Sequence, residues 1–214
     1  MERRTRVAVL AALTVALTGG CADGGESPSS AGSPSAPPSP TTSPVTPGPP
    51  WHDEVVAAPA GVTVGGKGTP CELPVTFSVP AGWKVEAVRT SAKFGEAGLV
   101  GFTMICELDA RPTGAVGFLR VWRGDPGSTQ QRFERFLTAY SAKAADAEYR
   151  RVRAGTMDAV EASYFKEDGG TYRDRAVVMS AWRHSVVFTL DAPEVEELLP
   201  AYQLAKQSAR INRD

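Results

Sequence analysis

The chain has little of what a catalytic centre needs. Its 214 residues include only two histidines, His52 and His184. It contains neither of the motifs G-x-S-x-G and H-E-x-x-H, which place a nucleophilic serine or zinc-binding histidines. Carboxylates are numerous, but no spacing singles out an acid and base pair. We therefore expect no catalytic residue, no metal site and no cofactor, and predict that the protein is not an enzyme.

An excess of basic charge is also absent. The chain has 23 Lys and Arg against 24 Asp and Glu, a formal net charge of −1. Proteins that bind nucleic acid or anionic lipid through electrostatics carry clusters of positive charge. The sequence therefore predicts no nucleic-acid partner.

No apolar run is long enough to cross a membrane, which takes about 20 residues. Residues 7–17 are apolar apart from Thr14 and follow the basic residues Arg3, Arg4 and Arg6. A basic start, a short apolar stretch and small residues make a secretory signal. We assign residues 1–20 to a signal peptide.

The signal ends in Leu17-Thr18-Gly19-Gly20-Cys21, which resembles a bacterial lipobox. In that motif the leucine stands three positions before the cysteine. Here Thr18 holds that position, and Leu17 stands one residue earlier. A diacylglyceryl group on Cys21 would supply two acyl chains, and two chains hold a protein stably on a bilayer. We predict lipidation at Cys21, with palmitate among the acyl chains, and anchoring to the cell membrane on its extracytoplasmic face. The alternative is a secreted protein with a stray cysteine.

A disordered tether follows the anchor. Residues 22–50 are almost entirely Ser, Pro, Thr, Gly and Ala, and such a segment cannot bury enough apolar surface to fold. We place the tether at residues 21–58 and a single globular domain at residues 59–214. The tether is a spacer, or alternatively an acceptor of O-linked glycans.

The domain has the patterns of an α+β fold. Apolar residues alternate along 71–79, a half-buried strand, and further strands are predicted at 99–108, 115–123, 149–154, 159–165, 172–182 and 185–190. In the second strand we expect Phe102, Met104 and Cys106 to share one face. One amphipathic helix begins after Ser128 and a second after Asp191, each with a capping residue. Strands, a helix, more strands and a helix favour an antiparallel sheet covered by helices.

With Cys21 assigned to lipid, Cys71 and Cys106 remain. An oxidising compartment favours a disulfide between them. The alternatives are free thiols, or a redox or metal pair, which would lack the C-x-x-C spacing.

Two phrases resemble a known family. Residues 73–83, Leu-Pro-Val-Thr-Phe-Ser-Val-Pro-Ala-Gly-Trp, and the ending Ser208-Ala209-Arg210-Ile211 are similar to the PsbP-like domain of LpqN-type lipoproteins from high-GC Gram-positive bacteria. The resemblance implies an α/β/α sandwich around an antiparallel sheet with two main helices. It also implies a non-enzymatic binding or accessory module at the cell envelope.

Aromatic and basic side chains on the later strands are the predicted ligand-binding residues. Tyr149, Arg151 and Arg153 would share one strand face, and Tyr172, Arg173 and Arg175 lie near a turn. The alternative for each is a solvated face of the sheet. The expected partner is an envelope protein or a small ligand. The alternative functions are a small-molecule or lipid carrier and, less in keeping with the sequence, a hydrolytic envelope enzyme.

Overall fold

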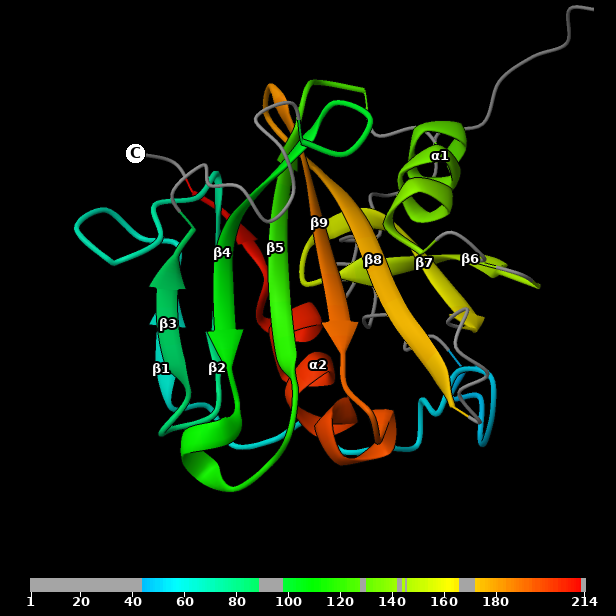
Figure 1. The fold of residues 1–214 in the computed structure, drawn as a ribbon, viewed down its shortest axis with the longest axis horizontal. Coiled ribbons are helices and arrows are strands. Elements are labelled where there is room, and N and C mark those ends of the chain that lie inside the picture. The colour runs from blue at the N-terminus through cyan, green and yellow to red at the C-terminus, as the bar shows by residue number, and fades with distance from the viewer. Residues whose placement is uncertain are drawn as a thin grey trace, which may run out of the picture. The chain divides into compact units, whose positions relative to one another are not determined.

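A seven-stranded antiparallel sheet forms the middle layer of the domain in the computed structural model, which describes residues 44–88, 98–127, 130–141, 144, 146–165 and 172–212. Every neighbouring pair of its strands runs antiparallel. The sheet twists, so that β6 and β7 run roughly horizontally in Figure 1 while β3, β4 and β5 run roughly vertically. In spatial order the strands are β3 (Lys84–Ala87), β4 (Phe102–Asp109), β5 (Phe118–Gly124), β9 (His184–Asp191), β8 (Arg173–Ala181), β7 (Met157–Phe165) and β6 (Glu148–Ala154).

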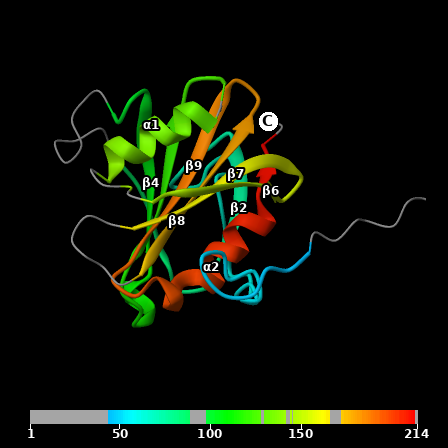
Figure 2. The ribbon, with the colours of Figure 1, turned by 90° about the vertical axis from the view of Figure 1, so that its right-hand side faces the viewer.

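Helices lie on both faces of this sheet. Helix α1 (Gln130–Tyr140) covers one face and α2 (Val195–Ser208) the other, with the sheet between them (Figure 2). A small antiparallel sheet shares the α2 side and is ordered β1 (Val62–Val64), β2 (Val75–Val79) and β10 (Arg210–Ile211). A 3-10 turn, η1 (Arg111–Thr113), follows β4. The predicted α+β sandwich with an antiparallel sheet and two main helices is confirmed.

Strand alternation divides the core into two layers. On the α1 face of the sheet, the buried side chains Phe133, Phe136 and Leu137 of α1 pack against the strands. On the α2 face, an apolar stripe of the α2 region, made of Leu198, Tyr202, Ala205 and Ala209, is buried against the sheet and β2. The period-two pattern of 71–79 is also confirmed, because every second residue from Cys71 to Val79 is buried.

A β-bulge in β4 overturns one expectation. The pairing of β4 with β5 shifts between Met104 and Cys106, because Ile105 is an extra residue in the strand. Phe102 and Met104 therefore pack under α1, whereas Cys106 joins the core on the α2 side. The prediction that these three residues share one face was wrong, because simple alternation holds only where no residue is inserted.

The bulge turns Cys106 towards β2, and the predicted disulfide is present. Cys71 and Cys106 are bonded, with their Cα atoms 5.8 Å apart. Both residues are buried, at 2% and 0% exposure. The bond joins the segment before β2 to the seven-stranded sheet.

The domain begins earlier than the sequence indicated. The compact unit runs from Ser43 to Asp214, and residues 44–58 belong to it. The Ala58 amide donates to the Pro200 carbonyl of α2, and Val55 packs on the core. The tether boundary at 58 was therefore placed too far along the chain, because composition did not reveal contacts made with distant elements.

Two smaller expectations also differ. The β8–β9 turn is formed by Trp182 and Arg183, one residue before the gap at 183–184 that separated the two predicted strands, with Trp182 at φ 53°. Helix α2 follows Glu194 rather than an Asp191 cap, and Asp191 instead pairs with Arg120. Pro200 lies inside α2. Ser128, after which the first helix was predicted to begin, lies outside the described residues, and so do residues 166–170, which separate two of the predicted strands.

Replacing Gly155 by alanine should destabilise the domain more than the same change at Gly114. Both glycines have positive φ, at 55° and 93°. A Cβ on Gly155 would overlap the backbone oxygen of Ala209, whereas a Cβ on Gly114 would meet open space. We expect Gly114→Ala to cost about 1 kcal/mol from backbone strain alone, and Gly155→Ala clearly more. Urea unfolding of the two variants measures the difference, and equal values would contradict the overlap.

Removing the disulfide should lower the free energy of unfolding. Cys71 and Cys106 are 35 residues apart, and closing a loop of that size contributes about 4 kcal/mol in the chain-entropy model. The double variant Cys71→Ser, Cys106→Ser should lose this amount in urea unfolding. Reduced wild-type protein is the matched control and should unfold at the same urea concentration as the variant.

Candidate functional site

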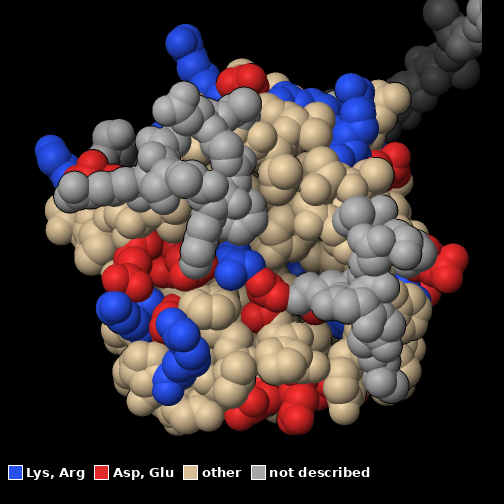
Figure 3. Space-filling view, in the orientation of Figure 1, with Lys and Arg blue, Asp and Glu red and all other residues tan. Residues whose placement is uncertain are grey.

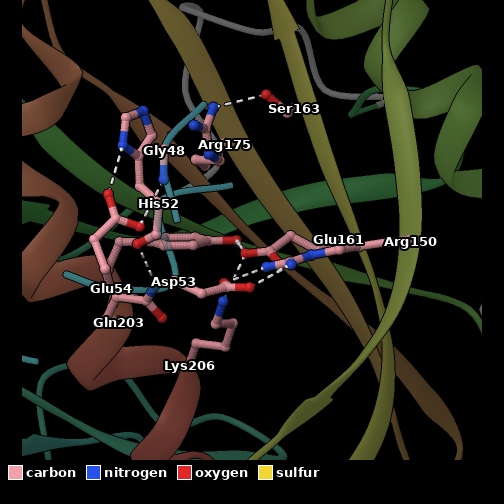
Figure 4. A network of polar contacts seen from close by, with 11 residues as sticks. Gly48, His52, Asp53, Glu54, Arg150, Glu161, Ser163, Arg175, Gln203 and Lys206 are labelled. Carbon is pink, nitrogen blue, oxygen red and sulfur yellow. Dashed lines mark hydrogen bonds and ion pairs between the residues drawn. The ribbon is translucent and has the colours of Figure 1, made fainter. Parts of the chain in front are cut away.

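A buried carboxylate lies at the centre of a polar network on the α2 face (Figure 4). Glu161 of β7 is 1% exposed. Its Oε1 accepts hydrogen bonds from Tyr202 Oη at 3.0 Å and from Lys206 Nζ at 2.7 Å, both from α2. Its Oε2 accepts from Arg150 of β6, with Nε at 2.9 Å. The network therefore joins the sheet to α2.

Arg150 extends the network to the segment that precedes the fold. Its guanidinium makes a two-pronged contact with Asp53, through Nη1–Oδ2 at 2.6 Å and Nη2–Oδ1 at 2.5 Å. The Trp51 ring lies 4.2 Å from the Arg150 Cζ, within cation–π range. Nearby, His52 contacts Glu54, which also accepts from the Gly48 amide (Figure 4). Asp53 and Trp51 thus attach residues 44–58 to the edge of the sheet.

Two basic side chains of this network, Arg150 and Lys206, pair with its two carboxylates, Asp53 and Glu161. Hydrogen bonds from Arg150 lower the pKa of Asp53 below its ordinary value of 3.8, although burial opposes the shift. Burial acts to lower the pKa of Arg150, but the contacts with Asp53 and Glu161 outweigh it and raise the pKa. Burial, and then the charge of Glu161, raises the pKa of Tyr202 well above its ordinary value. These mutually bonded side chains join α2 and residues 44–58 to the sheet.

Two hollows flank β6 beside this network. One, of about 540 Å³, lies on the α1 side and is lined by Gln130, Arg151, Val152, Asp158, Ala159, Val160, Val178 and Ser180. The other, of about 460 Å³, lies on the α2 side, where residues 44–46 and the α2 residues Gln203, Lys206 and Gln207 close it. Arg151 and Val152 line both hollows. The candidate site is this edge of the sheet with its two hollows.

Arg151 differs from the other arginines of β6. Arg150 is held by Asp53 and Glu161, and Arg153 pairs with Asp158 across the hairpin. Arg151 is exposed and has no ion pair or hydrogen bond within the described part of the chain. It is therefore a cation that can contact a ligand without first giving up a partner.

The structure divides the six predicted ligand-binding residues into two groups. Tyr149, Arg151 and Arg153 share the α1 face of β6, as the alternation predicted, and the Tyr149 ring meets Phe133 of α1 edge-on at 6.1 Å. Arg173 and Arg175 of β8 alternate with residues that face α1 and therefore lie on the other face of the sheet. The six residues do not form one site.

The β8 group is held within the protein. Arg173 pairs with Glu148 at 3.2 Å and lies over the Phe165 ring. Arg175 is 2% exposed and donates to Ser163 Oγ at 2.7 Å (Figure 4). Tyr172, just before β8, is 42% exposed. Arg173 and Arg175 serve the fold of the β7–β8 hairpin.

A second charged cluster lies on the α1 face near the start of β5. Arg120 contacts Glu107 at 2.8 Å and Asp191, and burial raises the pKa of the adjacent Tyr140. Arg111 and Arg120 both lie 5.0 Å from the Phe118 ring centroid. Acidic and basic side chains alternate over this part of the surface without a field of one sign (Figure 3).

The described ranges hold neither a cluster of metal-binding side chains nor a helix suited to cross a membrane. No group of three or more His, Cys, Asp or Glu residues there could hold a metal ion. No helix there has both the length and the apolar character for a membrane span. The predicted lipidation site Cys21 and the signal peptide lie outside the described residues.

Sequence reasoning missed Asp53, Glu161 and Lys206. Two of them carried a signal, since Glu161 stands at a core-facing position between Ala159 and Ser163, and Lys206 lies four residues after Tyr202 on the buried side of α2. A charge on a buried stripe indicates a paired partner. Asp53 carried no such signal, because it precedes the patterned part of the chain.

Comparison with known families identifies the chain more closely. Residues 41–209 match the Lipoprotein_23 family, described as "Uncharacterised lipoprotein". The chain belongs to this family. The match begins close to Ser43, where the compact unit starts, and so includes the segment that carries Trp51 and Asp53.

The lipoprotein is also similar to a solved structure. The solution structure of cyanobacterial PsbP (CyanoP) from Synechocystis sp. PCC 6803 is 14% identical to it, with a TM-score of 0.46. The similarity covers 65% of this chain and 87% of that one. No curated protein matches the sequence. Membership of a lipoprotein family places the chain at the cell envelope in association with a membrane.

Asp53 should make the lipoprotein sensitive to acid. Its pKa is lower in the folded than in the unfolded chain, so its contribution to stability is complete above the unfolded pKa of about 3.9. That contribution disappears as the pH falls through the folded pKa. We expect Asp53→Asn to lower the free energy of unfolding at pH 7 by about 1–2 kcal/mol, and to lose less stability than wild type on going from pH 5 to pH 3.

Asp158→Asn is the matched control, because this carboxylate also pairs with a β6 arginine but is 94% exposed. It should change stability little at either pH. If both variants behave alike in urea unfolding, the attachment of residues 44–58 through Asp53 is not what stabilises the domain.

Proposed function

We propose that this lipoprotein is a non-enzymatic binding or accessory module held on the extracytoplasmic face of the membrane by a lipid on Cys21. Residues 1–20 serve as its signal peptide, and the residues between Cys21 and Ser43 serve as a spacer. The resemblance to LpqN-type lipoproteins of high-GC Gram-positive bacteria belongs to this proposal. The lipoprotein family and the lipobox-like sequence at Cys21 support it.

The observation that carries the binding role is the pair of hollows on either side of Arg151. A ligand site combines a concave, largely apolar surface with a few polar groups that fix orientation. Here Val152, Val160 and Val178 supply apolar surface, and Arg151 supplies a positive charge that none of the described residues pairs. The site lies on regular strands, which hold its geometry rigidly.

The state of the carboxylates supports a non-enzymatic role. Glu161 accepts from three different side chains, and Arg120 and Arg150 hold Glu107, Asp191 and Asp53. A general base needs a lone pair directed at its substrate and a pKa near the working pH. Carboxylates tied to arginine are poor candidates for that task.

A carrier of small molecules is the second candidate. The hollow on the α1 side, at about 540 Å³, falls within the range of volumes that hold small ligands. A non-covalent adduct in the native mass spectrum of the purified lipoprotein, lost on denaturation, would favour the carrier. A mass equal to that of the protein alone would favour a protein partner.

Changing the lipidated cysteine tests the anchor. In Cys21→Ala no thioether can form, so the protein should lose its diacylglyceryl mass and leave the detergent phase on phase separation. The double variant Cys71→Ser, Cys106→Ser is the control and should stay in the detergent phase. External protease should digest the wild-type lipoprotein in intact cells. Retention of Cys21→Ala in the detergent phase, or protection from the protease, would contradict this anchor.

Site-specific photo-crosslinking tests the binding role. A photoreactive residue at position 151 should give a discrete crosslinked product in intact cells. The same residue at position 116 is the control, because Val116 is 54% exposed but lies away from both hollows. Products from both positions or from neither would argue against a binding site at β6.

A further inference from the structure

β6 is an edge strand, and one of its two sides is free of backbone pairing in the described part of the chain. β6 is the last strand of the seven-stranded sheet and pairs only with β7 in the described part of the chain (Figure 1). It is seven residues long, from Glu148 to Ala154. An exposed edge presents unused backbone donors and acceptors to any extended chain that approaches it.

The hairpin geometry shows which residues present those groups. Ala154 and Met157 close a two-residue turn, so they form a hydrogen-bonded pair. Pairs alternate along the ladder, so Arg150, Val152 and Ala154 use their backbone groups towards β7. Tyr149, Arg151 and Arg153 therefore direct theirs to the free edge, and no backbone hydrogen bond reaches them from the described turns and loops.

The surroundings of the edge suit an added strand. Side chains of a strand paired with β6 would alternate between the two faces of the sheet, and each face has a hollow there. Residues opposite Arg151 would enter the α1-side hollow, and their neighbours would enter the hollow lined by Val45 and Gln203. Backbone pairing combined with pockets for alternate side chains is the mode in which sheet edges bind extended peptides.

Charge selects among possible occupants. In full antiparallel overlap with a second copy, Arg151 would lie opposite Arg151 of that copy, and like charges directly opposite are unfavourable. An acidic side chain at that position would instead meet an arginine that has no ion pair with any residue the structure describes. We propose that the free edge of β6 binds an extended, acidic segment of a partner protein by adding it to the sheet as an eighth strand.

This inference rests on the proposed binding function and gives it a partner class. A defined probe is a labelled peptide as long as β6, with alternating valine and glutamate and blocked ends. Fluorescence anisotropy with the full-length lipoprotein in detergent micelles should give saturable binding. The same peptide with lysine in place of glutamate should bind more weakly. A third peptide with N-methyl groups on alternate residues loses the backbone donors and should not bind measurably.

Two substitutions at one position separate charge from backbone pairing. Arg151→Val keeps the backbone amide and should weaken binding of the acidic peptide about two- to fivefold, which is the contribution of one cross-strand charge pair. Arg151→Pro also removes an N–H that points away from β7, so the domain should fold while binding falls at least about tenfold. Arg123→Val, at an exposed arginine of β5, is the control and should leave binding unchanged.

Several results would overturn the proposal. These are equal binding of the N-methylated and unmodified peptides, stronger binding of the lysine peptide, and no saturable binding of the acidic one. A lipoprotein dimer in sedimentation that Arg151→Pro dissociates would show that a second copy occupies the edge. Should Arg151→Pro fail to fold, the N-methylated peptide still decides the question. Crosslinking from position 151 without acidic-peptide binding would leave the binding function standing and reject this partner class.

Discussion

The buried carboxylate of Glu161, which lies between the sheet and α2, is the constraint on which the surrounding structure depends. A buried charge is tolerated only when its hydrogen-bonding capacity is filled. Tyr202 and Lys206 of α2 and Arg150 of β6 supply those donors. The position of α2 on the sheet and the side-chain conformation of Arg150 follow from it. Arg150 in turn holds Asp53, so the chain entering the domain is fixed to the same point.

The bulge in β4 has a comparable effect at the other end of the sheet. One extra residue turns Cys106 from the α1 core to the α2 core, where Cys71 can reach it. The same shift leaves Phe102 and Met104 under α1. The disulfide and the ion network both lie on the α2 side of the sheet, where they fix the segment before β2, α2 and residues 44–58 to it. They give a rigid support for the strand at the edge of the sheet.

That rigidity bears on function, because an edge strand can bind only if it is already extended and in place. β6 is held by its backbone pairing with β7 and by the contact of its own Arg150 with Glu161. Binding therefore costs little conformational entropy in this strand. The arginines also discourage self-pairing, which is how natural sheet edges avoid aggregation. β6 can thus resist pairing with β6 of a second copy and still accept a partner of opposite charge.

The alternation of apolar residues determined seven of the strands but not the short β1, β3 and β10. Helical spacing determined the two helices. Both patterns depend on local geometry alone. The lipobox-like sequence and the Pro- and Ser-rich composition of the chain after Cys21 were likewise visible in the sequence. Tertiary structure decided what depends on distant contacts. The bulge separated Cys106 from Met104, residues 44–58 joined the domain, and Arg173 and Arg175 turned away from Arg151. It also brought Asp53, Arg150 and Lys206 around Glu161. A local sequence pattern does not reveal which acidic and basic side chains pair, because residues far apart in sequence meet only when the chain folds.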